Sequence, residues 1–207
     1  GLLGTSEDDV MFSSSEGESI EGFAGDDVIA GREGDDTLNA GSGDDILTGG
    51  AGSDMLTGGG GNDRYDFWRG DSADIIVNTG ESGSDDVVYF RKAVASNQIW
   101  FARSGDNLVA TLIGTTDSVS IRDWYAGLDN RLDFVAGEGM RLGADDVQAL
   151  VDAMALLTPP APGETELSPE LAETLASVLG SAWLPVAPDS AFSSDRDNNL
   201  NGDDRDN

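Results

Sequence analysis

Residues 22–66 read GFAGDDVIA, GREGDDTLN, AGSGDDILT, GGAGSDMLT and GGGGNDRYD, five nonapeptides that follow one another without a gap. They share the pattern G-G-x-G-x-D-x-U-x, in which U is a large apolar residue. The sixth position is always aspartate and the eighth is always large and apolar: Asp27, Asp36, Asp45, Asp54 and Asp63, then Ile29, Leu38, Leu47, Leu56 and Tyr65. A period of nine that holds at both positions predicts a solenoid, because each copy repeats one structural unit.

Two weaker copies precede these in the same register, GTSEDDVMF at 4–12 and SSSEGESIE at 13–21. They keep an acidic residue at the sixth position and an apolar residue at the eighth, but most of their glycines are absent. We interpret residues 1–21 as degenerate, metal-free rungs of the same solenoid that continue from an earlier part of a longer protein.

The glycines of the repeat predict tight turns. We expect glycine at the first, second and fourth positions to permit positive φ, so that the turn's carbonyl oxygens point inward. The first-position glycines are Gly22, Gly31, Gly49 and Gly58, and those at the fourth position are Gly25, Gly34, Gly43, Gly52 and Gly61. The D-x-U-x run that follows is extended, which directs the eighth residue into the interior as one step of an apolar ladder.

Two nonapeptides make one coil of 18 residues, so turns of like parity stack at a strand spacing of about 4.8 Å. This stacking brings Asp27 next to Asp45, Asp36 next to Asp54, and Asp45 next to Asp63. Calcium takes six to eight oxygen ligands, which the carbonyls of one turn and two stacked aspartates can supply, whereas magnesium demands a stricter octahedron. The sequence therefore predicts several calcium ions in the turns. The alternative, a disordered acidic linker, does not explain an apolar residue two positions after every repeated aspartate.

The composition narrows the function classes. The 207 residues include 11 Lys plus Arg against 40 Asp plus Glu, no His and no Cys, for a net charge of -29. Such a charge repels nucleic acid and favours cations. Ser-His-Asp triads, His-ligated zinc, thiol nucleophiles and disulfides are all excluded. The composition does not exclude a hydrolase that uses a pair of carboxylates. Carboxylates that bind calcium could not act as acids, however. We therefore expect no enzyme and no catalytic residue.

The segment after the repeats keeps the acidic-then-apolar order with irregular spacing, in GDSADII and GSDDVVYF. It predicts one or two further calcium sites that use Asp71, Asp74, Asp85 or Asp86, and we assign Asp74 and Asp85 as ligands. The alternative is that these are solvated turn carboxylates. The calcium-binding roll should therefore span residues 22–90.

Residues 91–136 predict an antiparallel cap on the open end of the solenoid, with strands at 98–103, 108–113 and 119–122. Its aromatic residues alternate along strands and favour a buried core over a sugar-binding platform. They are Trp100, Phe101, Trp124, Tyr125 and Phe134.

Residues 137–185 predict a helical flank. Asp145–Leu157 carries one apolar face of five residues, Val147, Leu150, Val151, Met154 and Leu157, and the Pro-rich TPPAPGE breaks this pattern. A second helix should begin at Pro169, with Ser168 as N-cap, and end near Leu179 before Gly180. The acidic residues 186–207 are either disordered or the start of another degenerate repeat.

The five phased copies resemble the RTX (repeat-in-toxin) family of secreted calcium-binding repeat proteins. Residues 97–125, NQIWFARSGDNLVATLIGTTDSVSIRDWY, resemble the segment that closes the last repeat block of adenylate cyclase toxins in that family. The resemblance implies an all-β fold: a right-handed parallel β-roll with an antiparallel β cap and one or two C-terminal helices. It also implies a chain that leaves a calcium-poor bacterial cytoplasm unfolded through type I secretion machinery and folds outside the cell.

Two functions follow from these features. We expect a monomeric, secreted calcium module that supports secretion and stability of a larger toxin or adhesin. The alternative is an extracellular adhesin module that binds a receptor or glycan and uses calcium only as a structural ion.

Overall fold

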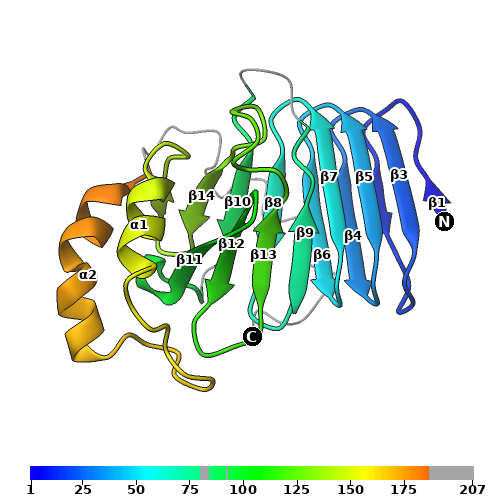
Figure 1. Ribbon diagram of the computed structural model, residues 1–207. Helices are drawn as coiled ribbons and strands as arrows, with labels where there is room; N and C mark the ends of the chain where they lie inside the picture. Colours follow the sequence, from blue (N-terminus) through cyan, green and yellow to red (C-terminus); the bar gives the residue numbers. More distant parts are fainter. Residues whose placement is uncertain (80–83, 92, 187–207) are drawn as a thin grey trace.

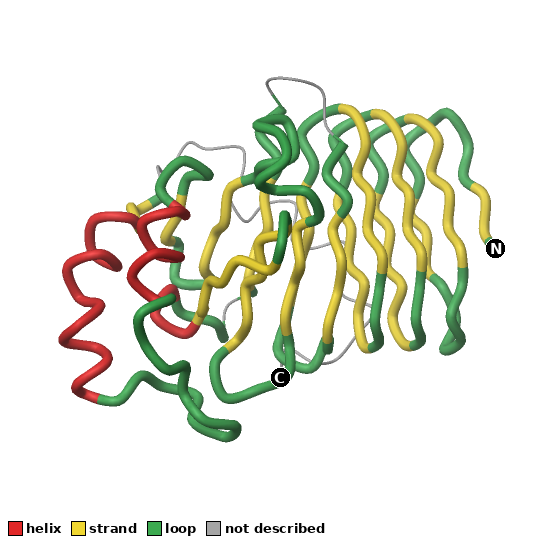
Figure 2. The backbone as a smooth tube through the Cα atoms, in the orientation of Figure 1, coloured by secondary structure: helices red, strands yellow, loops and turns green. Residues whose placement is uncertain are grey.

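The computed structural model describes residues 1–79, 84–91 and 93–186; the expectation for the acidic tail falls almost entirely outside them. Two eight-stranded sheets form the two layers of a flattened spiral, with turns along both edges (Figures 1 and 2). The N-terminus lies at one end of the spiral and the two helices lie at the other. The predicted β-roll with its cap and two helices is confirmed.

The first sheet has the strand order β1-β3-β5-β7-β9-β13-β12-β11. It is parallel as far as β13, after which β12 and β11 each pair antiparallel with the strand before them. The bounds are β1 Leu2–Leu3, β3 Ser19–Ala24, β5 Thr37–Ser42, β7 Met55–Gly60, β9 Ala73–Ile76, β13 Ser118–Ile121, β12 Asn107–Leu112 and β11 Ile99–Ser104.

The second sheet has the order β2-β4-β6-β8-β10-β14-β15-β16 when it is followed from the N-terminal end. It is parallel as far as β14, after which β15 and β16 are antiparallel. The bounds are β2 Val10–Phe12, β4 Val28–Glu33, β6 Ile46–Ala51, β8 Arg64–Phe67, β10 Val87–Phe90, β14 Asp133–Ala136, β15 Met140–Leu142 and β16 Trp183–Pro185.

The apolar residues at the eighth position form two ladders that face each other between the sheets. Register pairs Ile20 with Leu38 and Leu38 with Leu56 in one sheet, and Ile29 with Leu47 and Leu47 with Tyr65 in the other. All of these side chains are buried. The offset of 18 residues confirms that two nonapeptides make one coil.

The offset changes where the repeats end. Met55 pairs with Ile75, 20 residues later, and Arg64 pairs with Val87, 23 residues later. Because strand pairing still keeps the apolar residues inside, the extra residues are accommodated in the turns. The roll thus continues through β10, one coil beyond the last regular repeat.

The cap continues both sheets rather than one. The strands β11, β12 and β13 match the predicted meander, and a short 3-10 helix at Ser96–Gln98 precedes them. The sequence did not predict the strands β14, β15 or β16, which extend the second sheet. β14 lies within the predicted cap segment, whereas β15 and β16 lie in residues assigned to a helical flank. Aromatic packing joins the two halves of the cap: the Phe101 and Phe134 rings lie 5.1 Å apart and the Phe101 and Trp183 rings 6.4 Å apart.

Two helices cover the cap. The first, α1 at Val147–Met154, buries Val147, Leu150, Val151 and Met154 as predicted. It ends before the predicted Leu157, which is only partly buried. The second, α2 at Pro169–Ala182, has the predicted Ser168 N-cap, whose side chain accepts a hydrogen bond from the Leu171 N–H. The predicted end at Leu179 is wrong, because the helix passes through Gly180 to bury Ala182, and β16 then buries Trp183. A single helical glycine costs only about 1 kcal/mol, which such burial offsets.

Candidate calcium sites in the turns

The sixth-position aspartates are buried at the start of each strand and form two continuous ladders along the edges of the roll. In each step, Oδ1 accepts a hydrogen bond from the backbone N–H of the acidic residue one coil earlier. The bonds run from Asp27 N to Asp45 Oδ1 (2.8 Å), Asp36 N to Asp54 Oδ1 (2.7 Å) and Asp45 N to Asp63 Oδ1 (3.1 Å). The structure thus brings together the three pairs that the 18-residue coil predicts.

The second carboxylate oxygen of these residues has no hydrogen-bond partner. This oxygen, Oδ2, is buried and has no hydrogen-bond partner in five residues: Asp27, Asp36, Asp45, Asp54 and Asp63. A buried ionised carboxylate oxygen is costly unless a cation or a donor satisfies it. The same orphaned atom in five successive turns therefore indicates a repeated cation site.

Glycine at the first position leaves room for this oxygen. A Cβ placed on Gly31 would lie 2.5 Å from Asp36 Oδ2 and 2.5 Å from the carbonyl oxygen of Gly49 in the next turn. Gly22, Gly49 and Gly58 have the same conflict with their own aspartates. The expectation of positive φ at this position is wrong, because these glycines are absent from the positive-φ residues; the position requires space.

Positive φ occurs at the fourth and second positions instead. Gly61 has φ +126°, and the other fourth-position glycines behave likewise. At the second position the first two repeats lack glycine, yet Phe23 (φ 80°) and Arg32 (φ 71°) adopt the same left-handed conformation. The stacked turns above and below hold these two residues in a conformation that disfavours side chains.

Gly58→Ala should lower the melting temperature of the calcium-saturated protein, because the new methyl group would overlap Asp63 Oδ2. The expected loss is about 2–4 kcal/mol, since backbone and carboxylate must both move. Gly180→Ala is the matched control, because a Cβ there meets nothing within 4 Å and alanine favours the helix. Thermal unfolding followed by circular dichroism measures both; equal melting temperatures for the two variants would contradict the proposed crowding.

The two degenerate rungs satisfy their carboxylates without a metal. Oδ2 of Asp9 accepts hydrogen bonds from the Thr5 N–H (2.7 Å) and hydroxyl (3.0 Å). Glu18 accepts from the Ser14 N–H (2.6 Å) and hydroxyl (2.9 Å), and these bonds lower the pKa of Glu18. Hydroxyl side chains thus take the place that a cation would occupy, which supports the interpretation of residues 1–21 as metal-free.

Beyond the repeats, Asp74 and Asp86 continue the two ladders. Asp74 Oδ1 accepts from Asp54 N (3.0 Å), and Asp86 Oδ1 accepts from Asp63 N (2.9 Å). Both are buried, whereas Asp85 is exposed and its N–H donates to Asn62 Oδ1 (2.9 Å). Asp86, not the predicted Asp85, therefore continues the ladder directly before its strand, and its Oδ2 accepts from the Ser84 hydroxyl (2.8 Å), as the carboxylates of the degenerate rungs do from theirs.

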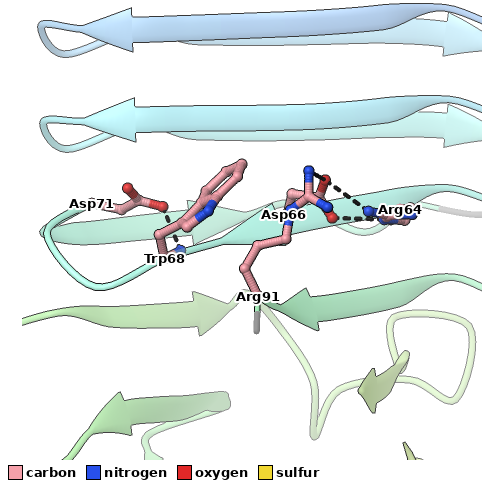
Figure 3. Close-up of polar contacts among 5 residues, drawn as sticks. All are labelled: Arg64, Asp66, Trp68, Asp71 and Arg91. Atoms are coloured by element: carbon pink, nitrogen blue, oxygen red, sulfur yellow. Dashed lines mark hydrogen bonds and ion pairs between the residues drawn. The ribbon is translucent and has the colours of Figure 1, made fainter. Parts of the chain in front are cut away.

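Two further aspartates are buried beside Asp74. Asp71 belongs to the turn that leads to Asp74, and Asp117, from the segment between β12 and β13, contacts that turn. Asp71 Oδ2 accepts from Trp68 N (2.7 Å), as Figure 3 shows. Asp117 accepts from Gly70 N (2.9 Å) and Ser72 N (3.2 Å), which links the cap to the roll. No sequence pattern predicted Asp117, because it lies outside the repeats.

Asp66 is a buried carboxylate of a different kind. Arg64 donates to both of its oxygens (2.6 and 3.0 Å), and Arg91 lies 3.2 Å from Oδ2 (Figure 3). The Arg64 and Arg91 guanidinium groups also lie over the Tyr89 and Trp68 rings, at 4.5 and 4.9 Å. Asp66 thus has two arginine side chains as partners, whereas Oδ2 of each sixth-position aspartate has no partner.

Burial raises the pKa of the ladder aspartates. Loss of water is the largest cause, and neighbouring carboxylates add to it. The pKa of Asp45 and of Asp63 rises to about 7, that of Asp54 to about 6 and that of Asp74 to about 8. Without a metal, the folded turns therefore hold protons more strongly than the unfolded chain does.

Calcium-stripped protein should become more folded as the pH falls from 8 towards 4. A raised folded pKa contributes stability that is present below the unfolded value of about 3.9 and is lost as the pH rises through about 7. Protons and calcium compete for the same oxygens, so calcium should bind more weakly at pH 5 than at pH 8 and should release protons near pH 7. Calorimetry in buffers of different ionisation enthalpy measures that release; a calcium affinity independent of pH would contradict it.

The oxygen set in these turns fits calcium. The described residues contain no group of three or more acidic side chains placed to hold a metal. Each turn instead offers up to two stacked carboxylates and the carbonyl oxygens of its close-packed backbone, which are hard neutral and anionic ligands. A site of this composition can supply structural coordination to a cation.

Comparison with protein families identifies the repeats. Residues 3–38, 21–56 and 39–73 match the RTX calcium-binding nonapeptide repeat. Residues 3–73 therefore carry RTX calcium-binding nonapeptide repeats, and the degenerate rungs lie within this match. The match ends at residue 73, before the cap, and does not address the resemblance of residues 97–125 to adenylate cyclase toxins.

Among solved structures, the chain is similar to the AlgE6R3 subunit from the Azotobacter vinelandii mannuronan C5-epimerase. The identity is 20% over 80% of this chain and 88% of that chain, with a TM-score of 0.27. Values this low say nothing about function, and the strand order establishes the roll independently.

Proposed function

We propose that this chain is a calcium-dependent folding module of a larger secreted bacterial protein, unfolded inside the cell and folded outside it. The observation that carries this proposal is the row of five buried aspartates whose Oδ2 atoms have no partner. The ligands are Asp27, Asp36, Asp45, Asp54, Asp63 and Asp74, together with backbone carbonyl oxygens of the turns.

The charge of the chain supports a switch between two calcium levels. With a net charge of -29, repulsion between like charges destabilises the compact state until divalent cations neutralise the turns. Calcium binds only where two coils are stacked, so its binding free energy is also folding free energy. A calcium-poor compartment would therefore keep the chain extended, which suits passage through a type I secretion channel.

The cap supports the same proposal. Its strands pair with the last strands of both sheets, β9 with β13 and β10 with β14, so the open end of the roll is covered. A covered end prevents edge-to-edge association. The described part of the chain has no helix long and apolar enough to cross a membrane.

A passenger enzyme fused to residues 1–207, in bacteria that carry a type I exporter, tests the secretion role. We expect active passenger in the medium only when the medium contains calcium, with the Asp45→Asn fusion reduced. Export that is equal without calcium, or no export at all, would refute the secretion role while leaving calcium binding intact.

The alternative of a sugar-binding cap is weakened by burial. The Trp100, Phe101, Trp124 and Phe134 side chains are all less than 8% exposed and pack in the core, as the sequence predicted. Only Tyr125 is partly exposed, and the Arg103 guanidinium lies 4.2 Å from its ring centroid. No aromatic platform is thus presented by these five residues.

A further inference from the structure

The turn between β8 and β9, at residues 68–72, continues one edge of the roll but contains only one glycine. It stacks on the turn before β7, since Gly52 pairs with Ser72. Ser72 therefore lies where the repeat has its fourth-position glycine, and it adopts the left-handed φ of 74°. Residues with a side chain disfavour this conformation, so contacts from elsewhere must hold the turn in its path.

A carboxylate from the cap holds this turn. Asp117, which is 6% exposed, accepts a hydrogen bond from Gly70 N at Oδ2 (2.9 Å) and one from Ser72 N at Oδ1 (3.2 Å). Next to it, Ser118 N donates to Ser72 O (2.7 Å). Asp117 is fixed in turn by its own cap loop, because its N–H donates to Thr115 Oγ1 (3.0 Å). The cap thus supplies the constraint that glycine supplies in the repeats.

The turn that Asp117 holds stacks on a carboxylate oxygen without a partner. Asp54 is 2% exposed, its Oδ2 has no hydrogen-bond partner, and its N–H donates to Asp74 Oδ1 (3.0 Å). One coil earlier, a Cβ placed on Gly31 would meet both Asp36 Oδ2 and a carbonyl oxygen of the next turn. By the same stacking, Asp54 Oδ2 faces the turn that leads to Asp74. A cation that satisfies this oxygen therefore requires that turn to keep its present path.

We propose that Asp117 is a positioning residue for the calcium ion held between Asp54 and Asp74, and that it is not itself a ligand. Both of its carboxylate oxygens already accept backbone hydrogen bonds. The affinity of this one ion then depends on a residue of the cap, whereas the ions nearer the N-terminus do not need it. The inference rests on the proposed calcium function and adds a residue that controls one of its sites.

The experiment measures calcium bound to the full chain and to Asp117→Ala by equilibrium dialysis against buffered free calcium, followed by elemental analysis. In Asp117→Ala, one ion should bind about tenfold more weakly or worse, and the other ions should keep their wild-type affinity. Asp129→Ala is the control, because it removes one charge from an exposed residue of the same cap. Asp117→Asn keeps one acceptor oxygen, so it should show a smaller loss, and it replaces the alanine variant if that variant does not fold in saturating calcium.

Adding Ser72→Gly to the Asp117 variant separates positioning of the turn from simple fastening of the cap. Glycine adopts the left-handed conformation without a partner, so the double variant should recover most of the lost affinity. Ser72→Gly alone should leave the affinity of the ion nearly unchanged. An affinity that stays low in the double variant would mean that Asp117 only fastens the cap, and it would overturn the positioning role.

The outcomes also distinguish this inference from the proposed function. A wild-type chain that binds no calcium would overturn both. A wild-type chain that binds calcium, with an Asp117→Ala variant of equal ion count and equal affinities, would overturn only the role of Asp117.

Discussion

Removing calcium at pH 8 should unfold the roll and convert its far-UV circular dichroism from a β signal to that of a coil. In the folded state, at least five buried carboxylate oxygens would then face no cation. Each buried unpaired charge costs several kcal/mol, whereas a whole domain is stable by about 5–15 kcal/mol. Two or three such charges therefore suffice to exceed the stability of the domain.

The measurement is a calcium titration with matched magnesium and sodium series. Calcium should restore the β signal, and a chelator should reverse the change. Sodium screens the net charge of -29 but supplies no coordination, so ionic strength alone should restore little. A chain that keeps its β signal in chelator at pH 8 would contradict metal-coupled folding and favour the adhesin alternative.

The repeated part of the fold could be predicted because its acidic and its apolar positions share one period of nine residues. The aspartate of the sixth position, such as Asp45, and the apolar residue of the eighth, such as Leu47, recur every nine residues. This period determines which residues stack and which face the core. The same period predicts the pairing of Asp45 with Asp63, which the hydrogen bond between them reproduces.

Prediction became unreliable where the period is lost. Asp85 and Asp86 are adjacent, and the sequence does not reveal the 23-residue offset that places Asp86 directly before the paired strand. The strands β15 and β16 have three residues each, too few for an alternating pattern, and their pairing depends on distant partners. The end of α2 was misplaced because burial of Ala182 outweighs the low helix propensity of Gly180.

Glycine at the first position shows how a correct pattern can have a different cause. The sequence cannot tell a glycine needed for positive φ from one needed for space, since both appear as the same letter. The structure separates them, because Gly31 crowds Asp36 whereas Gly34 has φ +107°. Ala40 then stands out as the one first-position residue among the five repeats that carries a Cβ.

Asp45→Asn should weaken calcium-driven folding far more than Asp44→Asn, although both changes remove one charge from adjacent residues. Asp45 belongs to two stacked pairs, since its Oδ1 accepts from Asp27 N and its own N–H donates to Asp63 Oδ1. Asparagine retains the Oδ1 acceptor but replaces the unpartnered Oδ2 with an amide NH2 group, whose nitrogen donates hydrogen bonds and cannot coordinate a cation. Asp44 is more exposed, and its Oδ1 accepts from the Asn62 N–H and side-chain amide (2.9 and 3.1 Å), contacts that asparagine can retain.

The calcium midpoint of folding, followed by circular dichroism, measures the difference. Loss of one charged ligand is worth about 1.5–3 kcal/mol, so the calcium midpoint for Asp45→Asn should rise about tenfold or more, and by about a hundredfold if the two neighbouring sites both weaken. Asp9→Asn provides a second control, because Thr5 rather than a cation satisfies Asp9 Oδ2. If Asp45→Asn shifted the midpoint no more than Asp44→Asn and Asp9→Asn did, the loss would reflect net charge alone, and the unpartnered oxygens of the ladder would not be calcium ligands.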